Sequence, residues 1–192
     1  MKTTVMIAAL VAAGTVQAAT YEIDSSHSSA GFKVRHLMIS NVRGQFTKVS
    51  GMAEFDAKNP AASKVEATVD VGTIDTRVEA RDKHLKSPDF FDVAKFPSIT
   101  FKSRKFAAAG AGKYKVTGDL TMHGVTKEVI VDLVDVSPEI KGQRGEMRIG
   151  GQGSTKINRK DYGLTYGALM EGGGAVIGEE VEITLDLELV KK

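Results

Sequence analysis

Four histidines are the side chains of this chain best suited to acid–base or metal chemistry. They stand at His27, His36, His84 and His123, and none has a second histidine at the short spacing that metal ligands often share. We therefore predict no metal site. His36 falls on the apolar side of an alternating stretch, where a histidine is more often a hydrogen-bonded core residue than a base.

A basic cluster surrounds the third histidine and consists of Arg81, Lys83, His84 and Lys86. Val78, Arg81 and Leu85 recur at helical spacing, which predicts one or two helical turns over residues 77–85. Ser87-Pro88 ends them, because proline disfavours helix at the residue before it. Such a cluster is usually a solvated helix face; the alternative is that it meets an anionic head group.

Other common chemistries lack their residues. The chain contains no cysteine, which removes thiol nucleophiles, thiolate metal sites and disulfides. No G-x-S-x-G motif supplies a serine elbow, and neither glycine run, at 150–153 or 172–174, is followed by a helix that would form a phosphate cradle. Paired carboxylates for acid–base work are not evident. We predict no catalytic residue and no cofactor.

The first eighteen residues have the pattern of a cleaved export signal. Lys2 gives a positive start, residues 5–13 are uncharged and apolar, and Val16-Gln17-Ala18 resembles a signal peptidase site. We predict cleavage after Ala18, a mature domain over 19–192, periplasmic localisation and no transmembrane segment in the mature chain.

The net charge argues against nucleic acid as a partner. The whole chain has 26 Lys and Arg against 24 Asp and Glu, and the eighteen leader residues include one lysine and no acid. The mature chain is therefore close to neutral, with no electrostatic reason to bind a polyanion.

Phenylalanines gather where the strand pattern is interrupted. Phe90, Phe91 and Phe96 lie among Pro, Ser and Asp residues, and Phe101 follows at the start of a new strand. An irregular segment that carries this much aromatic surface must bury it. We expect the segment from Arg81 to Phe101 to form a plug or wall at one end of a curved sheet.

The elements that position these residues are strands. Apolar and polar residues alternate most clearly in segments 49–55, 64–71, 113–122 and 180–190, and similar patterns cover 30–37, 99–105, 128–136 and 146–157. Residues 164–178 are rich in glycine and are predicted to be a long mobile loop. We predict an all-β fold, a single antiparallel β-barrel of about eight strands with a short helical insertion.

The inward faces of the predicted strands carry several small residues. They are Gly51, Ala53, Ala67 and Gly118. A barrel of about eight strands is either just filled by its side chains or able to hold one small ligand. The alanines favour free volume, whereas each glycine could equally mark a bulge or a bend.

Four motifs in order resemble the YceI-like family of periplasmic, lipocalin-like, polyisoprenoid-binding proteins, and the resemblance covers the mature chain. They are F-x-V-x-H-x-M-I-S from Phe32 with G-x-F from Gly44, R-D-x-H-L-x-S-x-D-F-F from Arg81 with F-P-x-I-x-F from Phe96, G-D-L-T-x-H-G-V-T-K from Gly118, and I-N-R-x-D-Y-G from Ile157.

The resemblance implies a barrel that holds a polyisoprenoid or other long-chain lipid in its lumen, commonly as a homodimer and without catalysis. It also implies that residues 81–96 and the pair Asn158-Arg159 lie near the ligand. With the inward small and aromatic residues, the candidate ligand contacts are Phe32, Val34, His36, Phe46, Ala67, Arg81, His84, Phe90, Phe91, Phe96, Phe101, Asn158, Arg159 and Tyr162.

Two alternatives from other classes stay open at this point. One is a protein-interaction module built on a filled barrel that dimerises. The other is a lipid or amide hydrolase that uses His36 or His84.

Overall fold

The computed structural model describes residues 18–171 and 173–192. The predicted export signal at 1–18 therefore falls outside the described residues except for Ala18. The strands are β1 (Ala19–Ile23), β2 (Ser29–His36), β3 (Ser40–Phe46), β4 (Val49–Phe55), β5 (Lys64–Asp70), β6 (Ile74–Asp75), β7 (Ser98–Gly110), β8 (Lys113–Met122), β9 (Val125–Val134), β10 (Ile140–Lys141), β11 (Met147–Asn158) and β12 (Ile177–Lys191). The helix α1 spans Glu79–Lys86, and short 3₁₀ turns span Pro60–Ala62, Val71–Thr73 and Arg159–Tyr162.

Eight strands close into an antiparallel barrel, in the order β11, β9, β8, β7, β5, β4, β1, β12 and back to β11. The β11–β12 ladder closes the ring and runs from Arg148 opposite Val190 to Asn158 opposite Glu180. The prediction of a single all-β, lipocalin-like barrel of about eight strands with one short helix is confirmed. Closure removes the unpaired sheet edges that an open sheet would expose.

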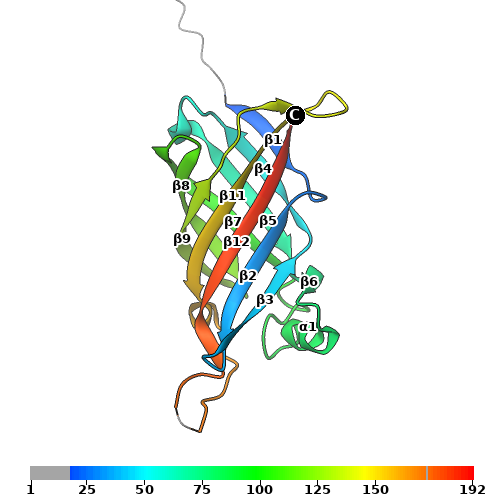
Figure 1. Cartoon of the computed structure of the whole chain (residues 1–192), viewed down its shortest axis with the longest axis vertical. Coiled ribbons are helices and arrows are strands. Elements are labelled where there is room, and N and C mark those ends of the chain that lie inside the picture. The colour runs from blue at the N-terminus through cyan, green and yellow to red at the C-terminus, as the bar shows by residue number, and fades with distance from the viewer. Residues whose placement is uncertain (1–17, 172) are drawn as a thin grey trace, which may run out of the picture.

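The barrel wall changes at one end, because two strands share the same edge of β12. β1 pairs with the last residues of β12, whereas β2 pairs with its first part, from Ile177 to Asp186. β2 then carries β3 and β6 outward, and no ladder joins β3 to β5 in the described part of the chain. Figure 1 shows α1 beside β3 and β6 at this lower end. The helical segment therefore completes the wall where the sheet does not.

Side-chain alternation sets the inner and outer faces as predicted. In β8, Tyr114, Val116, Gly118, Leu120 and Met122 are buried, and the residues that alternate with them are exposed or half-buried. These inward residues form the apolar core together with inward residues of β4, β7 and β12. Burial of this apolar face is the main stabilising contribution to such a sheet.

Local hydrogen bonds begin and end α1. The carboxylate of Asp82 accepts from the backbone N–H and the hydroxyl of Thr76, at 2.9 and 2.5 Å, which ties the first turn to β6. The helix ends where the Ser87 N–H and hydroxyl both donate to the carbonyl of His84, one residue before Pro88. The Phe91 N–H then donates to the Leu85 carbonyl, so the chain folds back and turns its aromatic rings toward the barrel.

Two segments differ from the predicted strands. Alternation was identified only from residue 30 onward, but a strand, β1, precedes it, and the chain turns between β1 and β2 where the Ser26 N–H and the His27 ring bond to the Asp24 carboxylate. Residues 40–46, where no alternating strand was identified, form the full strand β3. Among the residues described, no helix combines the length and the apolar character needed to cross a bilayer.

Candidate functional site

A large apolar cavity occupies the barrel interior, with a volume of about 820 Å³. It is bordered along β12 by Val181, Ile183, Leu185, Leu187 and Leu189. Strand residues rise by about 3.4 Å each, so this row covers about 27 Å of strand and, at the usual tilt of about 40°, about 20 Å of barrel axis. For comparison, the hydrocarbon layer of one bilayer leaflet, which the lipid tails fill, is about 15 Å thick. The cavity is therefore long enough for a lipid tail, and the barrel is not filled by its own side chains.

All but three of the predicted contact residues border this cavity. Those that border it are Phe32, Val34, His36, Phe46, Ala67, Arg81, His84, Phe90, Phe91, Phe101 and Arg159. The three others lie elsewhere. The Phe96 ring packs on the His123 ring at the β8–β9 turn, with centroids 4.5 Å apart. Asn158 follows the inward Ile157 and turns outward, where its side chain accepts from the Lys160 N–H.

Tyr162 is the third predicted residue outside the cavity lining. It is 1% exposed and packs with Leu120, Met122, Ile157 and Leu164. Its hydroxyl is buried and has no hydrogen-bond partner among the described residues. Burial raises the pKa of Tyr162 to about 12, because the phenolate cannot be solvated there.

The small inward residues do not all supply free volume. At Gly118 an added Cβ would lie 2.5 Å from the Phe101 ring, so that ring lies over the glycine. Gly51 has φ +150°, and an added Cβ would lie 2.2 Å from the Glu66 carbonyl oxygen, so it is needed for the close approach of β4 and β5. Only Ala53 and Ala67, of the four, border the cavity.

An aromatic cluster lies at the α1 end of the cavity. The His84, Phe90 and Tyr166 rings are mutually packed, with centroids 5.0, 4.9 and 4.8 Å apart. Tyr166 was not among the predicted contacts, since it stands in the glycine-rich loop after β11. Its aromatic character in a segment with little charge was the available signal.

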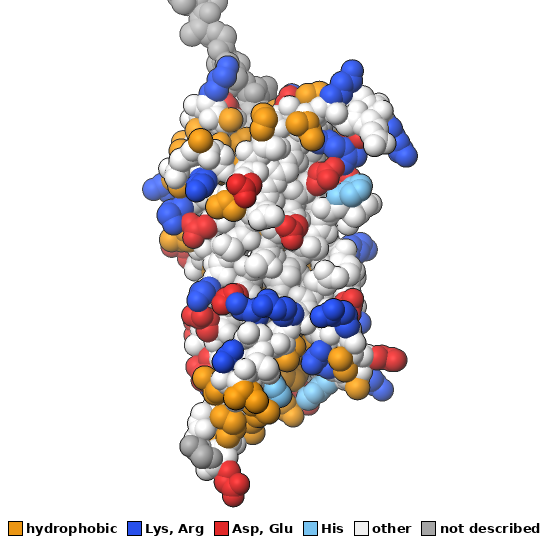
Figure 2. Space-filling model, in the orientation of Figure 1, with side chains coloured by type: hydrophobic (Ala, Val, Ile, Leu, Met, Phe, Trp, Pro, Cys, Tyr) orange, Lys and Arg blue, Asp and Glu red, His pale blue; other side chains and the backbone are white. Residues whose placement is uncertain are grey.

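The rim outside this cluster is apolar and exposed. Figure 2 shows hydrophobic side chains gathered at the lower end of the barrel. They belong to the β2–β3 turn and the loop before β12, where Ile39 is 78% and Leu169 80% exposed. The turn residues Leu37 and Met38 also have positive φ, at 50° and 59°, a conformation that glycine or asparagine would adopt more cheaply. Neither feature favours stability.

Arg159 fixes the loop that forms this rim. Its side chain is 5% exposed and donates to the carbonyls of Gly178, Leu164, Tyr166 and Ile177, at 2.9, 2.5, 2.7 and 3.3 Å. Desolvation lowers the pKa of the guanidinium from its ordinary value, with an opposing contribution from Glu179. The resemblance implies that Arg159 lies near a ligand; in the structure it holds Leu164 and Tyr166 at the start of the loop and Ile177 and Gly178 at its end.

Arg81 lies on the facing side of the mouth, on α1. Its Nε donates to the Thr76 hydroxyl at 2.8 Å and its Nη2 to the Thr76 carbonyl at 3.0 Å. The same Thr76 hydroxyl donates to the Asp82 carboxylate, so Thr76 links Arg81 and Asp82 in a short polar network. This network positions the guanidinium at the cavity edge.

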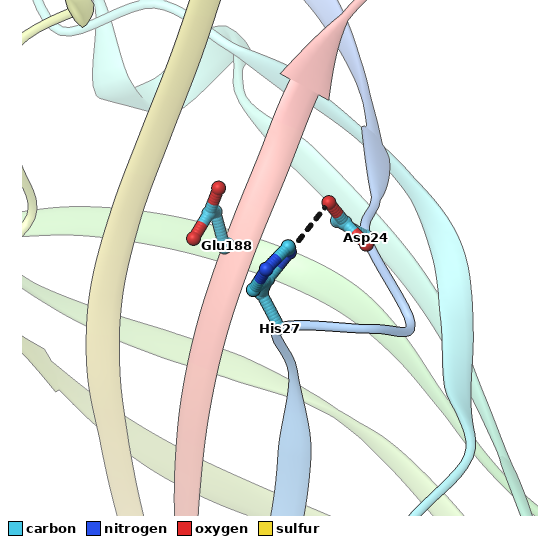
Figure 3. Close-up of side chains that lie close together, drawn as sticks. All are labelled: Asp24, His27 and Glu188. Carbon is cyan, nitrogen blue, oxygen red and sulfur yellow. Dashed lines mark hydrogen bonds and ion pairs between the residues drawn. The ribbon is translucent and has the colours of Figure 1, made fainter. Parts of the chain in front are cut away.

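A cluster of acidic residues and a histidine on the outer surface resembles a metal site, but an arginine side chain already neutralises it. Asp24, His27 and Glu188 place their ligand atoms within 4.8 Å of one another (Figure 3). However, the Arg148 guanidinium donates to the carboxylates of both Asp24 and Glu188, the first at 2.8 Å. Bonds from His27 and Arg148 lower the pKa of Asp24, and the Asp24 carboxylate raises that of His27. The group is thus an ion-pair network that ties β1 to β11 and β12.

His84 and Asp89 form a pair in which the histidine could act as a base oriented by the carboxylate, with His84 Nε2 2.9 Å from Asp89 Oδ2. In the described chain, no hydroxyl side chain is hydrogen-bonded to the His84 ring, and the Ser87 hydroxyl donates to a backbone carbonyl instead. A nucleophile–base contact, which a hydrolase of this kind requires, is therefore not formed.

Proteins of similar length have sequences related to this one. A UPF0312 protein of Vibrio parahaemolyticus is 41% identical over 180 residues, covering 92% of this chain and 89% of that protein. A UPF0312 protein of Ectopseudomonas mendocina is 38% identical over 181 residues, covering 93% and 91%.

Solved structures share the fold. BcnA of Burkholderia cenocepacia has a TM-score of 0.74 at 25% identity, covering 86% of this chain and 98% of that one. A YceI protein of Campylobacter jejuni has a TM-score of 0.69 at 30% identity, covering 82% and 90%. A polyisoprenoid binding domain from Saccharophagus degradans has a TM-score of 0.64 at 15% identity, covering 91% and 99%, which shows the fold alone.

The model of the YceI-like domain matches residues 21–189, which is nearly the whole domain that follows the predicted export signal. The cavity, the closed barrel and these relatives agree, and the chain belongs to the YceI-like family.

Proposed function

We propose that this protein binds a polyisoprenoid or similar long-chain lipid, of the isoprenoid quinone precursor class, in the barrel lumen. It transports or stores the lipid in the periplasm without chemical change. The single observation that carries this proposal is the apolar cavity of about 820 Å³ inside the barrel. The fold shared with a domain described as polyisoprenoid binding supports the same ligand class.

The physical requirement of such a ligand is length and dryness. Each buried methylene contributes roughly 0.8 kcal/mol, whereas measured affinities level off near −20 kcal/mol. Ordering a flexible chain therefore offsets much of the gain. Walls of branched aliphatic residues and rings such as Phe90 and Phe91 accept a tail without fixing its register.

Titration with geranylgeraniol tests the proposal. Because the chain has no tryptophan, displacement of a fluorescent long-chain probe is the practical readout. We expect saturable displacement with one site per barrel. Absence of saturable binding by geranylgeraniol, by a C16 alcohol and by their anionic counterparts, geranylgeranyl phosphate and palmitate, would refute the lipid-binding role.

Export and assembly are separate parts of the proposal. We expect the mature protein in the periplasmic fraction to begin at Ala19, which N-terminal sequencing reads directly. We also expect a homodimer, to be measured by light scattering after gel filtration.

A hydrolase remains the second candidate because His84 is paired with Asp89 at the cavity edge. Turnover of a panel of lipid esters and amides, lost in His84→Ala, would support it. A carrier shows no turnover in either protein.

A further inference from the structure

Arginines without an ion-pair partner among the described residues distinguish the α1 end of the cavity. Five arginines border the cavity, namely Arg35, Arg43, Arg77, Arg81 and Arg159. The single bordering carboxylate, Glu54, faces β1 and β5 near the other end and is paired with Lys64 at 3.7 Å. Across residues 18–171 and 173–192, no carboxylate lies within 4.0 Å of any of the five guanidinium groups, and the rest of the chain contains no Asp or Glu.

Only two of the five arginines, Arg81 and Arg159, are held at the cavity mouth. Arg35 and Arg43 alternate with the inward residues of β2 and β3, so their side chains lie on the outer face of the sheet. Arg81 and Arg159, by contrast, are half-buried and buried and are fixed by hydrogen bonds at the cavity edge.

Arg159 retains one unused donor. A guanidinium has five N–H groups, and four of them donate to backbone carbonyls. The remaining Nη2 N–H has no partner in the described part of the chain. Glu179 is the nearest source of negative charge, but it is bonded to Lys160 at 2.5 Å. A buried cation that meets only neutral carbonyls keeps most of its desolvation cost.

Arg81 is in a similar position. Its guanidinium donates to the hydroxyl and the carbonyl of Thr76, both neutral acceptors. Asp82 is engaged with Thr76, and Asp89 is engaged with His84, so neither carboxylate is bonded to the guanidinium.

Tyr166 brings the two arginines to the same opening. Its carbonyl accepts from Arg159, and its ring packs on the ring of His84. His84 lies one helical turn after Arg81 on α1, on the same face. Both arginines are therefore linked to the His84–Tyr166 contact, Arg159 through the Tyr166 carbonyl and Arg81 through its position on the same face of α1 as His84.

We infer that the mouth selects a single-chain lipid whose head group is an anion, a phosphate or a carboxylate, held by Arg81 and Arg159 while the tail fills the tunnel. This inference rests on the proposed lipid-binding function and adds the chemical class of the head. Guanidinium groups form strong, charge-assisted hydrogen bonds with both anions. An anionic head would also supply the countercharge that the structure leaves out.

Pairs of ligands with the same tail test the inference. Geranylgeranyl phosphate is compared with geranylgeraniol, and palmitate with hexadecanol, by displacement of the same fluorescent probe. We expect the anionic member to bind roughly ten- to hundredfold more tightly in at least one pair. A preference confined to the first pair identifies a phosphate head, and one confined to the second a carboxylate head. Equal affinities within both pairs would overturn the inference and leave lipid binding intact, whereas no binding by any of the four overturns the proposed function.

Variants separate recognition of the head from a merely structural role. Arg81→Gln is expected to reduce the preference for the anion about tenfold, seen as a larger loss of affinity for geranylgeranyl phosphate than for geranylgeraniol. Arg159→Gln is expected to do the same; if it loosens the loop, both members of a pair weaken together, and Arg81→Gln decides. Arg104→Gln is the matched control, because Arg104 bonds to Asp119 and Glu128 on the outer surface. Retention of the full anion preference in Arg81→Gln and Arg159→Gln contradicts the assignment.

Discussion

Replacement of Ala67 by phenylalanine would place a ring in the middle of the tunnel. Ala67 lies on the inner face of β5, is half-buried, and borders the cavity. It stands opposite Gly51 on β4 and Phe101 on β7. A larger side chain at this position can project only into the lumen, because both neighbouring strands are already in close contact.

The size of the effect follows from the apolar surface that the ring displaces. A phenyl group excludes about three methylenes of tail, each contributing roughly 0.8 kcal/mol, so binding weakens by about 2.4 kcal/mol. That corresponds to a Kd raised roughly fiftyfold. Stability should change little, since the ring enters open space. If Ala67 were packed core, overpacking would instead cost about 1–3 kcal/mol of unfolding free energy.

Probe displacement by geranylgeraniol and calorimetric unfolding, measured on the same samples, distinguish these outcomes. Thr68→Phe is the control, because Thr68 is the next residue of β5 and is exposed on the outer face. We expect Ala67→Phe to lose affinity and keep its Tm, and Thr68→Phe to keep its affinity. Unchanged geranylgeraniol affinity in a folded Ala67→Phe protein would refute the reasoning that a tail occupies the lumen.

Three further changes test individual contacts. Because hydrogen bonds from His27 and a neighbouring guanidinium lower the pKa of Asp24, its stabilising contribution is present above the unfolded pKa of about 3.9 and is lost as pH falls through the lower folded value; Asp24→Asn should flatten the acid limb of a plot of unfolding free energy against pH, and an unchanged limb would contradict this. Tyr162→Phe removes a buried hydroxyl without a described partner and should leave urea stability equal or raise it by up to about 1 kcal/mol, whereas a clear loss would reveal a partner for that hydroxyl. Gly118→Ala should cost about 1–3 kcal/mol in thermal unfolding, because its Cβ would lie 2.5 Å from both the Phe101 ring and the Lys102 carbonyl oxygen, and a neutral result would show that ring and backbone both move aside freely.

The fold could be predicted from the sequence where one face of a strand is buried and the other is wet. The segment 113–122 was predicted with the bounds that β8 has, because its alternation leaves only one register. Spacing and Pro88 predicted helical turns over 77–85, and α1 spans 79–86. The break after Ile23 was not predicted, since it depends on side-chain bonds to Asp24 rather than on apolar periodicity.

The site was harder to predict, because it depends on which way irregular segments face. Phe90, Phe91 and Phe96 lie in the same irregular segment, yet only the first two border the cavity. The Phe96 ring instead packs on His123 at the β8–β9 turn. Tyr166 reaches the mouth because Arg159 holds its carbonyl, a contact between loop and strand end that no local pattern encodes. Free volume at Gly118 was excluded by a ring on the neighbouring strand, which a single-strand pattern also cannot show.

The content of the lumen in the natural protein tests the central claim most directly. Purification from the periplasm without detergent, organic extraction and mass spectrometry would identify any bound molecule and its amount per chain. The account predicts a long-chain isoprenoid or similar single-chain lipid, near one per barrel, that is reduced in Ala67→Phe and unchanged in Thr68→Phe. Reproducible absence of any lipid from the natural protein, together with no uptake of geranylgeranyl phosphate or geranylgeraniol, would contradict it.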